Sequence, residues 1–314
     1  MAFTMHSHSG QFCPGHAKDQ LEDIIKHAIS LGYTTMGLTE HMPRTSLEDL
    51  YPEELDDPEG SLAVLFPRHA AYLAEAQRLQ AKYASQLHIL IGFEGEFPRP
   101  AYGTLIADLA THATVDYFVG SLHHISAEPI DYDASYYARA VASAGGTERL
   151  AYARYYDQQH DMLTALHPRV VGHFDLVRLL SSAPDHRDVR AEWPEVWDRI
   201  ARNLAVVAGY GGWLECNSSA LRKGLAEPYP GRQIADEWVR LGGRFTLSDD
   251  SHGIAQVGTN YGRALDYLSS LGVTSLWTLR REPHPGGGGE DGKKAELVEV
   301  EVELESVRAV VSKW

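Results

Sequence analysis

Short apolar runs and stretches of helical periodicity alternate along most of the chain. Leu21, Ile24, Ile25 and Ala28 recur at the spacing of an amphipathic helix, and Gly32 stands where a C-terminal cap belongs. Runs typical of buried strands cover residues 2–5, 34–39, 87–93, 117–122, 170–172, 212–214 and 244–247. Helices are predicted between them, over residues 67–85, 102–113, 147–165, 196–207 and 234–241.

This alternation predicts parallel strands joined by helical crossovers. Seven strands, each followed by a helix, indicate the α/β class in its barrel form, and 314 residues suit one such domain. In barrels of this kind the catalytic groups lie at the C-terminal ends of the strands. The polar residues that follow each apolar run are therefore the first candidates for chemistry.

Two segments interrupt the alternation. Residues 42–66 contain Pro43, Pro52 and Pro58 among many acids, and we expect them to form a long excursion over the active face. Residues 286–289 are all glycine and predict a flexible tether. Residues 299–304 then alternate strictly and predict a half-solvated edge strand. We predict a single domain over residues 1–314, with an appended segment after the tether.

A histidine or a carboxylate lies at the end of almost every predicted strand. These residues are His6, His8, His41, Glu94, His123, His173, Asp250 and His252, and His16 in the first loop makes a ninth candidate ligand. Nine ligands exceed the four of a tetrahedral zinc site. They predict two or three divalent ions, with zinc, iron or manganese favoured by mixed imidazole and carboxylate ligands. Two ions about 3.5–4 Å apart suit hydrolysis of a phosphate ester.

Several neighbouring residues compete for these roles. Glu96 competes with Glu94 as the bridging carboxylate, and Asp249 competes with Asp250. The Gly-x-Glu pattern favours Glu94, and the Asp-x-His spacing favours Asp250. His124 is expected to point away from His123 and to have a structural or substrate-contacting role. The remaining candidates are Glu215 and Asn217 for ligand support or recognition of a substrate amine, Glu40 and Asp175 for orienting histidines, and Cys13 as a loop residue or a thiolate ligand.

Composition restricts the partners that the protein could bind and the cell compartment in which we expect it. A net charge of -15 disfavours nucleic acid, whose binding depends on Lys and Arg contacts to phosphates. No run approaches the roughly 18 apolar residues of a membrane helix, and the N-terminus does not resemble a signal peptide. The two cysteines, Cys13 and Cys216, form no disulfide framework, so we expect a reducing cytoplasm.

The strand-end motifs resemble, in order, those of the polymerase and histidinol phosphatase (PHP) superfamily. The matching motifs are His6-x-His8, Thr39-Glu40-His41, Gly92-x-Glu94, Gly120-Ser121-x-His123, Gly172-His173 and Asp250-x-His252. Within the superfamily the chain is similar to the histidinol-phosphate phosphatases, in particular the fungal form. That finer resemblance rests on residues 40–44, 172–178 and 215–223.

The resemblance implies a distorted seven-stranded β/α barrel with a trinuclear site. One ion would take His6, His8, Glu94 and Asp250, a second would share Glu94 and add His123 and His173, and a third would use His16, His41 and His252. The implied reaction is hydrolysis of L-histidinol phosphate to L-histidinol and phosphate, in histidine biosynthesis, by attack of a metal-bound hydroxide. Glu94, Asp250 and His252 would be catalytic, with Asp250 or a metal-bound water protonating the leaving group.

Three arginines are predicted to bind the phosphate, because each lies just beyond a strand-end motif and offers a bidentate fork. They are Arg44, Arg178 and Arg222, each of which could instead form a surface salt bridge. Asn217 and His124 are further candidates for substrate contact. The alternatives to this function are a phosphodiesterase or nuclease on the same site, another small-molecule phosphatase, and a catalytically inactive metal-binding regulator.

Overall fold

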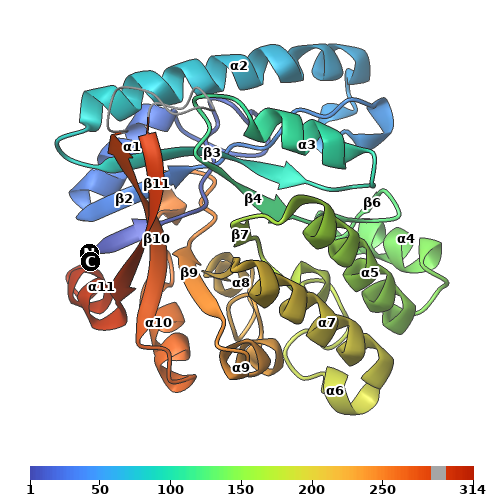
Figure 1. Ribbon diagram of the computed structural model, residues 1–314. Helices are drawn as coiled ribbons and strands as arrows, with labels where there is room; N and C mark the ends of the chain where they lie inside the picture. The colour runs from blue at the N-terminus through green and yellow to red at the C-terminus, as the bar shows by residue number, and fades with distance from the viewer. Residues whose placement is uncertain (284–294) are drawn as a thin grey trace.

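Seven parallel strands form a barrel in the computed structural model, which describes residues 1–283 and 295–314 (Figure 1). The strand order is β1-β2-β3-β4-β7-β8-β9. The strands are β1 (Ala2–Thr4), β2 (Tyr33–Leu38), β3 (His88–Glu96), β4 (Tyr117–Ser121), β7 (Val170–Val171), β8 (Trp213–Asn217) and β9 (Arg244–Ser248). The predicted fold class and barrel are confirmed, and every strand lies within about two residues of its predicted position except at the end of β3 and β8.

The two outer strands of the sheet meet and complete the barrel. The amide of Met5 donates to the carbonyl of Leu247 at 3.1 Å, and the amide of His8 donates to that of Ser251 at 2.8 Å. Ser7 and Ser251 also form a parallel bridge. These bonds join the segment after β1 to β9 and to the residues that follow it, so the first and last strand-end motifs lie beside each other.

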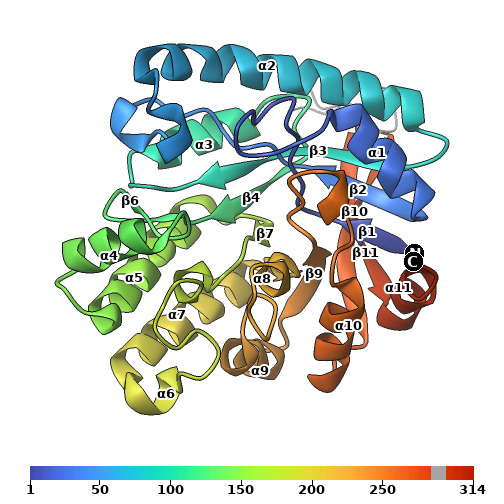
Figure 2. The same cartoon turned by 180° about the vertical axis from the view of Figure 1, so that it is seen from behind.

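Helices surround the barrel (Figures 1 and 2). The longer ones are α1 (Leu21–Ser30), α2 (Pro58–Tyr83), α3 (Tyr102–Ala110), α4 (Ala134–Ser143), α5 (Glu148–Leu166), α7 (Pro194–Tyr210), α9 (Arg232–Arg240), α10 (Tyr261–Ser270) and α11 (Leu304–Val311). Short helical turns are α6 (Val189–Glu192), α8 (Ser219–Arg222), η1 (Leu47–Asp49), η2 (Pro52–Glu54), η3 (Leu176–Arg178) and η4 (Ile254–Gln256). A small hairpin pairs β5 (His124–Ile125) with β6 (Glu128–Pro129).

Helix α2 begins nine residues before the predicted start at Pro67. The side chain of Asp57 caps it by accepting from the amide of Gly60 at 3.2 Å, and Pro58 occupies the first turn, where a missing N–H costs little. Pro67 lies inside the helix. The predicted excursion is therefore shorter, covering residues 42–57 and carrying η1 and η2.

The C-terminal residues pack on the opposite end of the barrel from the strand-end motifs. Strand β10 (Ser275–Pro283) pairs antiparallel with β11 (Ala295–Glu303), and the predicted edge strand over 299–304 falls within β11 except for its last residue. The N-terminal ammonium of Met1 donates to the carbonyl of Ser306 at 2.7 Å, and Val307 of α11 is fully buried. The predicted tether at 286–289 lies outside the described residues.

Among the residues that the structure describes, no helix is long and apolar enough to cross a membrane.

Candidate metal centre

The strand-end histidines and carboxylates converge on one face of the barrel. Ligand atoms of four groups lie within 4.8 Å of one another: His6, His8 and Asp250; His8, His41 and His252; Glu94, His123 and His173; and His41, Glu94 and Glu96. We call these residues the rim cluster. They come from the ends of β1, β2, β3, β4, β7 and β9, as expected for parallel strands that end at one face.

Glu94 lies at the middle of the rim cluster. Its carboxylate oxygens lie 3.0 Å from His173 Nε2, 3.0 Å from His41 Nδ1, 3.4 Å from His123 Nε2, 3.5 Å from His6 Nε2 and 3.6 Å from His8 Nε2. Glu96 contacts fewer of these histidines, with His41 Nδ1 at 2.7 Å and His123 Nδ1 at 3.9 Å. The geometry therefore makes Glu94 the carboxylate best placed to be shared between ions.

Asp250 and Asp249 point in different directions. Asp250 lies 3.4 Å from His8 Nε2 and 3.7 Å from His6 Nε2. Asp249 instead accepts hydrogen bonds from the hydroxyl of Tyr33 at 3.0 Å and the amide of Gly258 at 2.7 Å. Asp250 has a φ of +47°, which is uncommon for a non-glycine residue and typical of strained functional sites. This backbone turn places Asp250 toward the histidines and leaves Asp249 in the core.

The histidines present ring nitrogens that no hydrogen bond within the protein uses. Among the described residues no hydrogen-bond partner exists for His6 Nε2, His8 Nδ1 and Nε2, His41 Nε2, His123 Nδ1, His173 Nδ1 and His252 Nε2, all of which are buried. Buried polar atoms in proteins are normally hydrogen-bonded, so this many in one place calls for a ligand. Imidazole nitrogens around shared carboxylates fit divalent metal ions well.

Electrostatics holds two of these donors, His8 and Glu94, in the state that metal ions require. Burial and the neighbouring His41 lower the pKa of His8 to about 3, so this imidazole is neutral at pH 7. Burial would raise the pKa of Glu94, but His123 and His6 lower it well below its ordinary value. A neutral imidazole and an ionised carboxylate are both ready to coordinate a cation. For His6 and His41, burial lowers the pKa but neighbouring acidic groups raise it well above its ordinary value, so a bound cation would have to displace a proton there.

Glu215 and Asn217 of β8 support the rim cluster from beneath. Glu215 Oε2 lies 3.1 Å from His6 Nδ1, and Glu215 Oε1 accepts from the backbone amide of His173 at 2.5 Å. The Asn217 amide donates to Glu215 at 2.7 Å and to Asp250 at 3.3 Å. Both side chains are fully buried. These contacts fit an orienting role, which is often found behind metal-binding histidines.

Residues 42–57 contribute to the same face. His16 is a third exposed, and its Nδ1 lies 2.6 Å from Glu53 Oε1. Its ring lies 4.9 Å from that of His252 and 5.3 Å from that of His41. The hydroxyl of Tyr51 lies 3.2 Å from His41 Nδ1 and donates to Glu96. The excursion thus positions His16 and His41 at the edge of the rim cluster.

A cavity of about 360 Å³ opens above the rim cluster. This volume is in the range of small-molecule sites. Its charged walls outside the rim cluster are formed by Glu53, Asp131, Arg222 and Lys223, and His124 also lines it. Arg222 donates to the carbonyls of Asp249 and Asp250 at 3.1 and 3.0 Å. Of the three predicted phosphate-binding arginines, the structure brings this one to the cavity.

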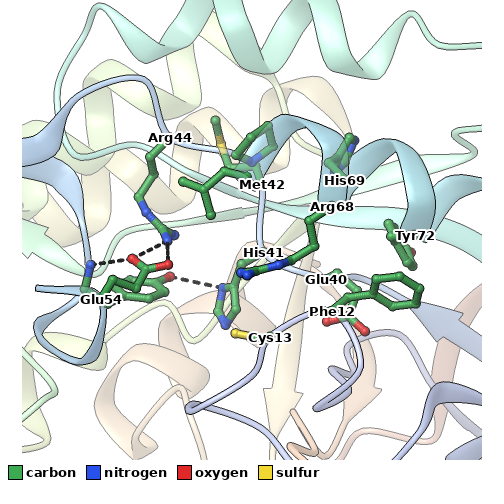
Figure 3. A pocket seen from close by; sticks show the side chains of 13 residues that line it. Phe12, Cys13, Glu40, His41, Met42, Arg44, Glu54, Arg68, His69 and Tyr72 are labelled. Atoms are coloured by element: carbon green, nitrogen blue, oxygen red, sulfur yellow. Dashed lines mark hydrogen bonds and ion pairs between the residues drawn. The ribbon is translucent and has the colours of Figure 1, made fainter. Parts of the chain in front are cut away.

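Arg44 and Arg178 do not face the cavity. Arg44 donates to both oxygens of Glu54 at 2.5 and 2.6 Å and lines a separate cavity of about 20 Å³, where Figure 3 shows it directed at Glu54. Arg178 donates to Asp175 at 2.9 Å and to Asp185 at 3.1 Å, and lines a third cavity. Both side chains are buried and neutralised by carboxylates, because the turns after their strands direct them into the protein.

The remaining candidates occupy supporting positions. Glu40 accepts from the hydroxyl of Ser9 at 2.5 Å and lines the small cavity of Figure 3 together with Cys13. Burial raises the pKa of Glu40 to about 7 and that of Cys13 to about 11. Asp175 accepts hydrogen bonds from Arg178 and from the amide of Gly231, and no hydrogen bond or ion pair joins it to a rim histidine. Its role in orienting histidines stays a prediction.

Sequence reasoning missed four residues at the site. Lys223 follows Arg222 directly at the end of the 215–223 segment. Its charge and this position could have indicated a second phosphate-binding side chain. Tyr51 and Glu53 lie in the excursion and Asp131 in the loop after β6, where no periodicity or strand end marks them. Their places depend on how loops fold back over the barrel.

Comparison with known proteins agrees with this geometry. A family model described as the PHP domain matches residues 4–219, more than half of the chain. The chain therefore belongs to the PHP domain family, and the resemblance inferred from the strand-end motifs is confirmed. It is 42% identical over 91% of its length to a Schizosaccharomyces pombe protein named "Probable histidinol-phosphatase", covering 92% of that protein.

Two further similarities extend this result. The Saccharomyces cerevisiae protein named histidinol-phosphatase is 33% identical, over 84% of this chain and 87% of that protein. A solved Lactococcus lactis structure, described as histidinol phosphate phosphatase complexed with Zn, L-histidinol and phosphate, has a TM-score of 0.64 at 19% identity. The match covers 88% of this chain and 96% of that chain. At this identity the structural similarity supports the fold.

Proposed function

We propose that this protein is a metal-dependent phosphomonoesterase that hydrolyses L-histidinol phosphate to L-histidinol and phosphate. The observation that carries the proposal is the rim cluster, with its unpartnered buried imidazole nitrogens. It lines a cavity whose wall also contains the basic side chains of Arg222 and Lys223. The names of the two yeast relatives support the substrate, and the ligands of the Lactococcus lactis structure agree with it.

We propose the same division of ligands for two or three ions as the resemblance implies. His6, His8, Glu94 and Asp250 would hold one, Glu94, His123 and His173 a second, and His16, His41 and His252 a third. The proximity of His8 to His41 and His252 supports sharing between the first and third sets. When bound, such ions supply Lewis acidity toward water and toward phosphoryl oxygens. Zinc, iron and manganese all fit this ligand set.

The residues of the chain itself perform the remaining tasks. Arg222 is held by two backbone carbonyls and has no carboxylate partner among the described residues, so its positive charge is available to a phosphate. Lys223 adds a second charge beside it. Glu215 holds the His6 ring in place, and Asn217 and Ser219 donate to Asp250 at 3.3 and 3.2 Å. The site is thus preorganised for an anion before the substrate enters.

We also propose that residues 1–314 act as one unit, since the C-terminal segment packs directly on β1 and β9. We place the reaction in a reducing cytoplasm, because both cysteines are free.

The decisive experiment measures phosphate release from L-histidinol phosphate together with elemental analysis of the purified protein. We expect turnover, bound transition metal or zinc, and loss of activity on chelation that is restored by adding metal. Activity confined to a phosphodiester would favour the nuclease alternative. A metal-loaded protein without turnover on either substrate would favour a binding protein.

A further inference from the structure

One carboxylate that lines the substrate cavity makes no hydrogen bond or ion pair with any described residue. Four described acidic residues line the cavity: Glu53, Glu94, Asp131 and Asp250. Glu94 and Asp250 belong to the rim cluster, and Glu53 lies 2.6 Å from His16. Asp131 has no hydrogen bond or ion pair to any described residue, although it is partly buried. It is therefore a free negative charge facing the site.

The backbone around Asp131 is held firmly in place. The β5–β6 hairpin pairs His124 with Pro129, and the amide of Ile130 donates to the carbonyl of His123 at 3.0 Å. On the other side, Asp133 caps α4 by accepting from the amide of Tyr136 at 2.8 Å. Ile130 itself is fully buried. Asp131 is thus fixed between two anchored segments, directly beside His123 and His124.

Outside the rim cluster, the cavity has two basic residues on one segment and Asp131 on another. Arg222 and Lys223 follow β8, whereas Asp131 follows the β5–β6 hairpin that comes after β4, and β7 lies between β4 and β8 in the strand order. The substrate of the proposed reaction has the same polarity. It has a phosphate at one end and, a short carbon chain away, a primary amine that is protonated at neutral pH.

We propose that Asp131 determines substrate specificity by binding the ammonium group of L-histidinol phosphate while the phosphate faces Arg222 and the rim cluster. The inference rests on the proposed function and deepens it. A partly buried carboxylate with no protein partner forms a charge-assisted hydrogen bond to an ammonium ion without first losing another contact. Phosphate esters without an amine gain nothing from it.

The test combines a protein variant with a substrate variant. Wild type and Asp131→Asn are assayed with L-histidinol phosphate and with 3-(imidazol-4-yl)propyl phosphate, which lacks the amine. We expect Asp131→Asn to raise KM for L-histidinol phosphate by at least about tenfold, the usual size of one hydrogen bond to a charged group. KM for the amine-free ester should stay within about twofold of wild type.

Product inhibition gives an independent reading of the same contact. Asp131→Asn should raise the inhibition constant of L-histidinol by a similar factor and leave that of inorganic phosphate unchanged. The matched control is Glu128→Gln, in the same hairpin, whose carboxylate pairs with Arg139 at 2.7 Å and does not line the cavity. This control should change neither constant.

Two results would overturn the inference while leaving the proposed function intact. One is an unchanged KM for L-histidinol phosphate in Asp131→Asn. The other is an equal rise in KM for both esters, which would assign Asp131 a general effect on the site. If wild type fails to hydrolyse L-histidinol phosphate at all, the proposed function itself is contradicted, and the inference falls with it.

Discussion

The rim cluster and the surroundings of Arg178 differ in whether their buried polar groups have hydrogen-bond partners within the protein. Around Arg178, the guanidinium is surrounded by Asp175, Asp185 and the carbonyls of Glu227 and Pro228, so its donors are used within the protein. In the rim cluster, many imidazole nitrogens lack any such partner among the described residues. Both regions follow strand ends, so position alone does not distinguish a structural charge from a functional one.

What separates the two regions is whether the protein satisfies its own buried groups. A buried ion pair with complete partners needs nothing further, although removing one partner leaves an uncompensated charge. Buried donors and acceptors without partners are costly unless a ligand completes them. Arg222 belongs with the rim cluster on this criterion, because carbonyls hold it and no described carboxylate neutralises it.

The largest effect is expected from Glu94→Gln. Glu94 contacts five rim histidines, so its loss should remove metal from the protein and lower kcat/KM by about a thousandfold or more, since metal ions supply several kcal/mol of charge stabilisation. Phosphate release and elemental analysis measure both changes. Asp185→Asn beside Arg178 is the control and should keep full metal content. Unchanged metal in Glu94→Gln would remove Glu94 from the ligand set.

The next effect concerns stability. Arg178→Ala should lower the free energy of unfolding by about 3–5 kcal/mol, because Asp175 and Asp185 lose their buried partner. KM for L-histidinol phosphate should not change, since Arg178 lies outside the substrate cavity. Urea denaturation and steady-state kinetics give the two values. A large rise in KM with unaltered stability would contradict this prediction and assign Arg178 to substrate binding.

Arg222→Ala should show the opposite pattern. We expect KM to rise by about ten- to a hundredfold, corresponding to the 1.5–3 kcal/mol of a hydrogen bond to a charged group. Loss of stability should be smaller than for Arg178→Ala. Arg222→Lys keeps the charge without the bidentate fork, so its KM should lie between that of wild type and that of Arg222→Ala. Equal kinetics in Arg222→Ala and wild type would leave phosphate binding to other groups.

The smallest effect is expected from Cys13→Ser. Burial raises the pKa of the Cys13 thiol to about 11, so the thiolate that binds metals is scarce at neutral pH. Metal content and kcat/KM should therefore stay within about twofold of wild type. Elemental analysis that shows a lost ion would extend the metal-binding region into the small cavity beside His41.

The sequence alone determined the barrel and the residues that end its strands. Apolar runs specify buried strands, and their regular alternation with helical patterns leaves few topologies for a parallel sheet. Since parallel strands end at one face, the convergence of His6, Glu94 and His173 followed from local pattern. Helix α2 begins nine residues before its predicted start at Pro67, because the Asp57 cap and Pro58 form its first turn.

Only the tertiary structure decided which of the predicted arginines stays available to a ligand. The Asp-x-His spacing already favours Asp250 over Asp249, and the positive φ of Asp250 supplies the physical reason, because it turns this carboxylate toward the histidines. The partners that fold around each arginine decide that Arg178 is internally neutralised and Arg222 is free to meet an anion. Asp131 faces the site because a hairpin folds back onto His123. Local pattern records which groups are present, whereas their orientation and remaining charge depend on segments distant in the chain.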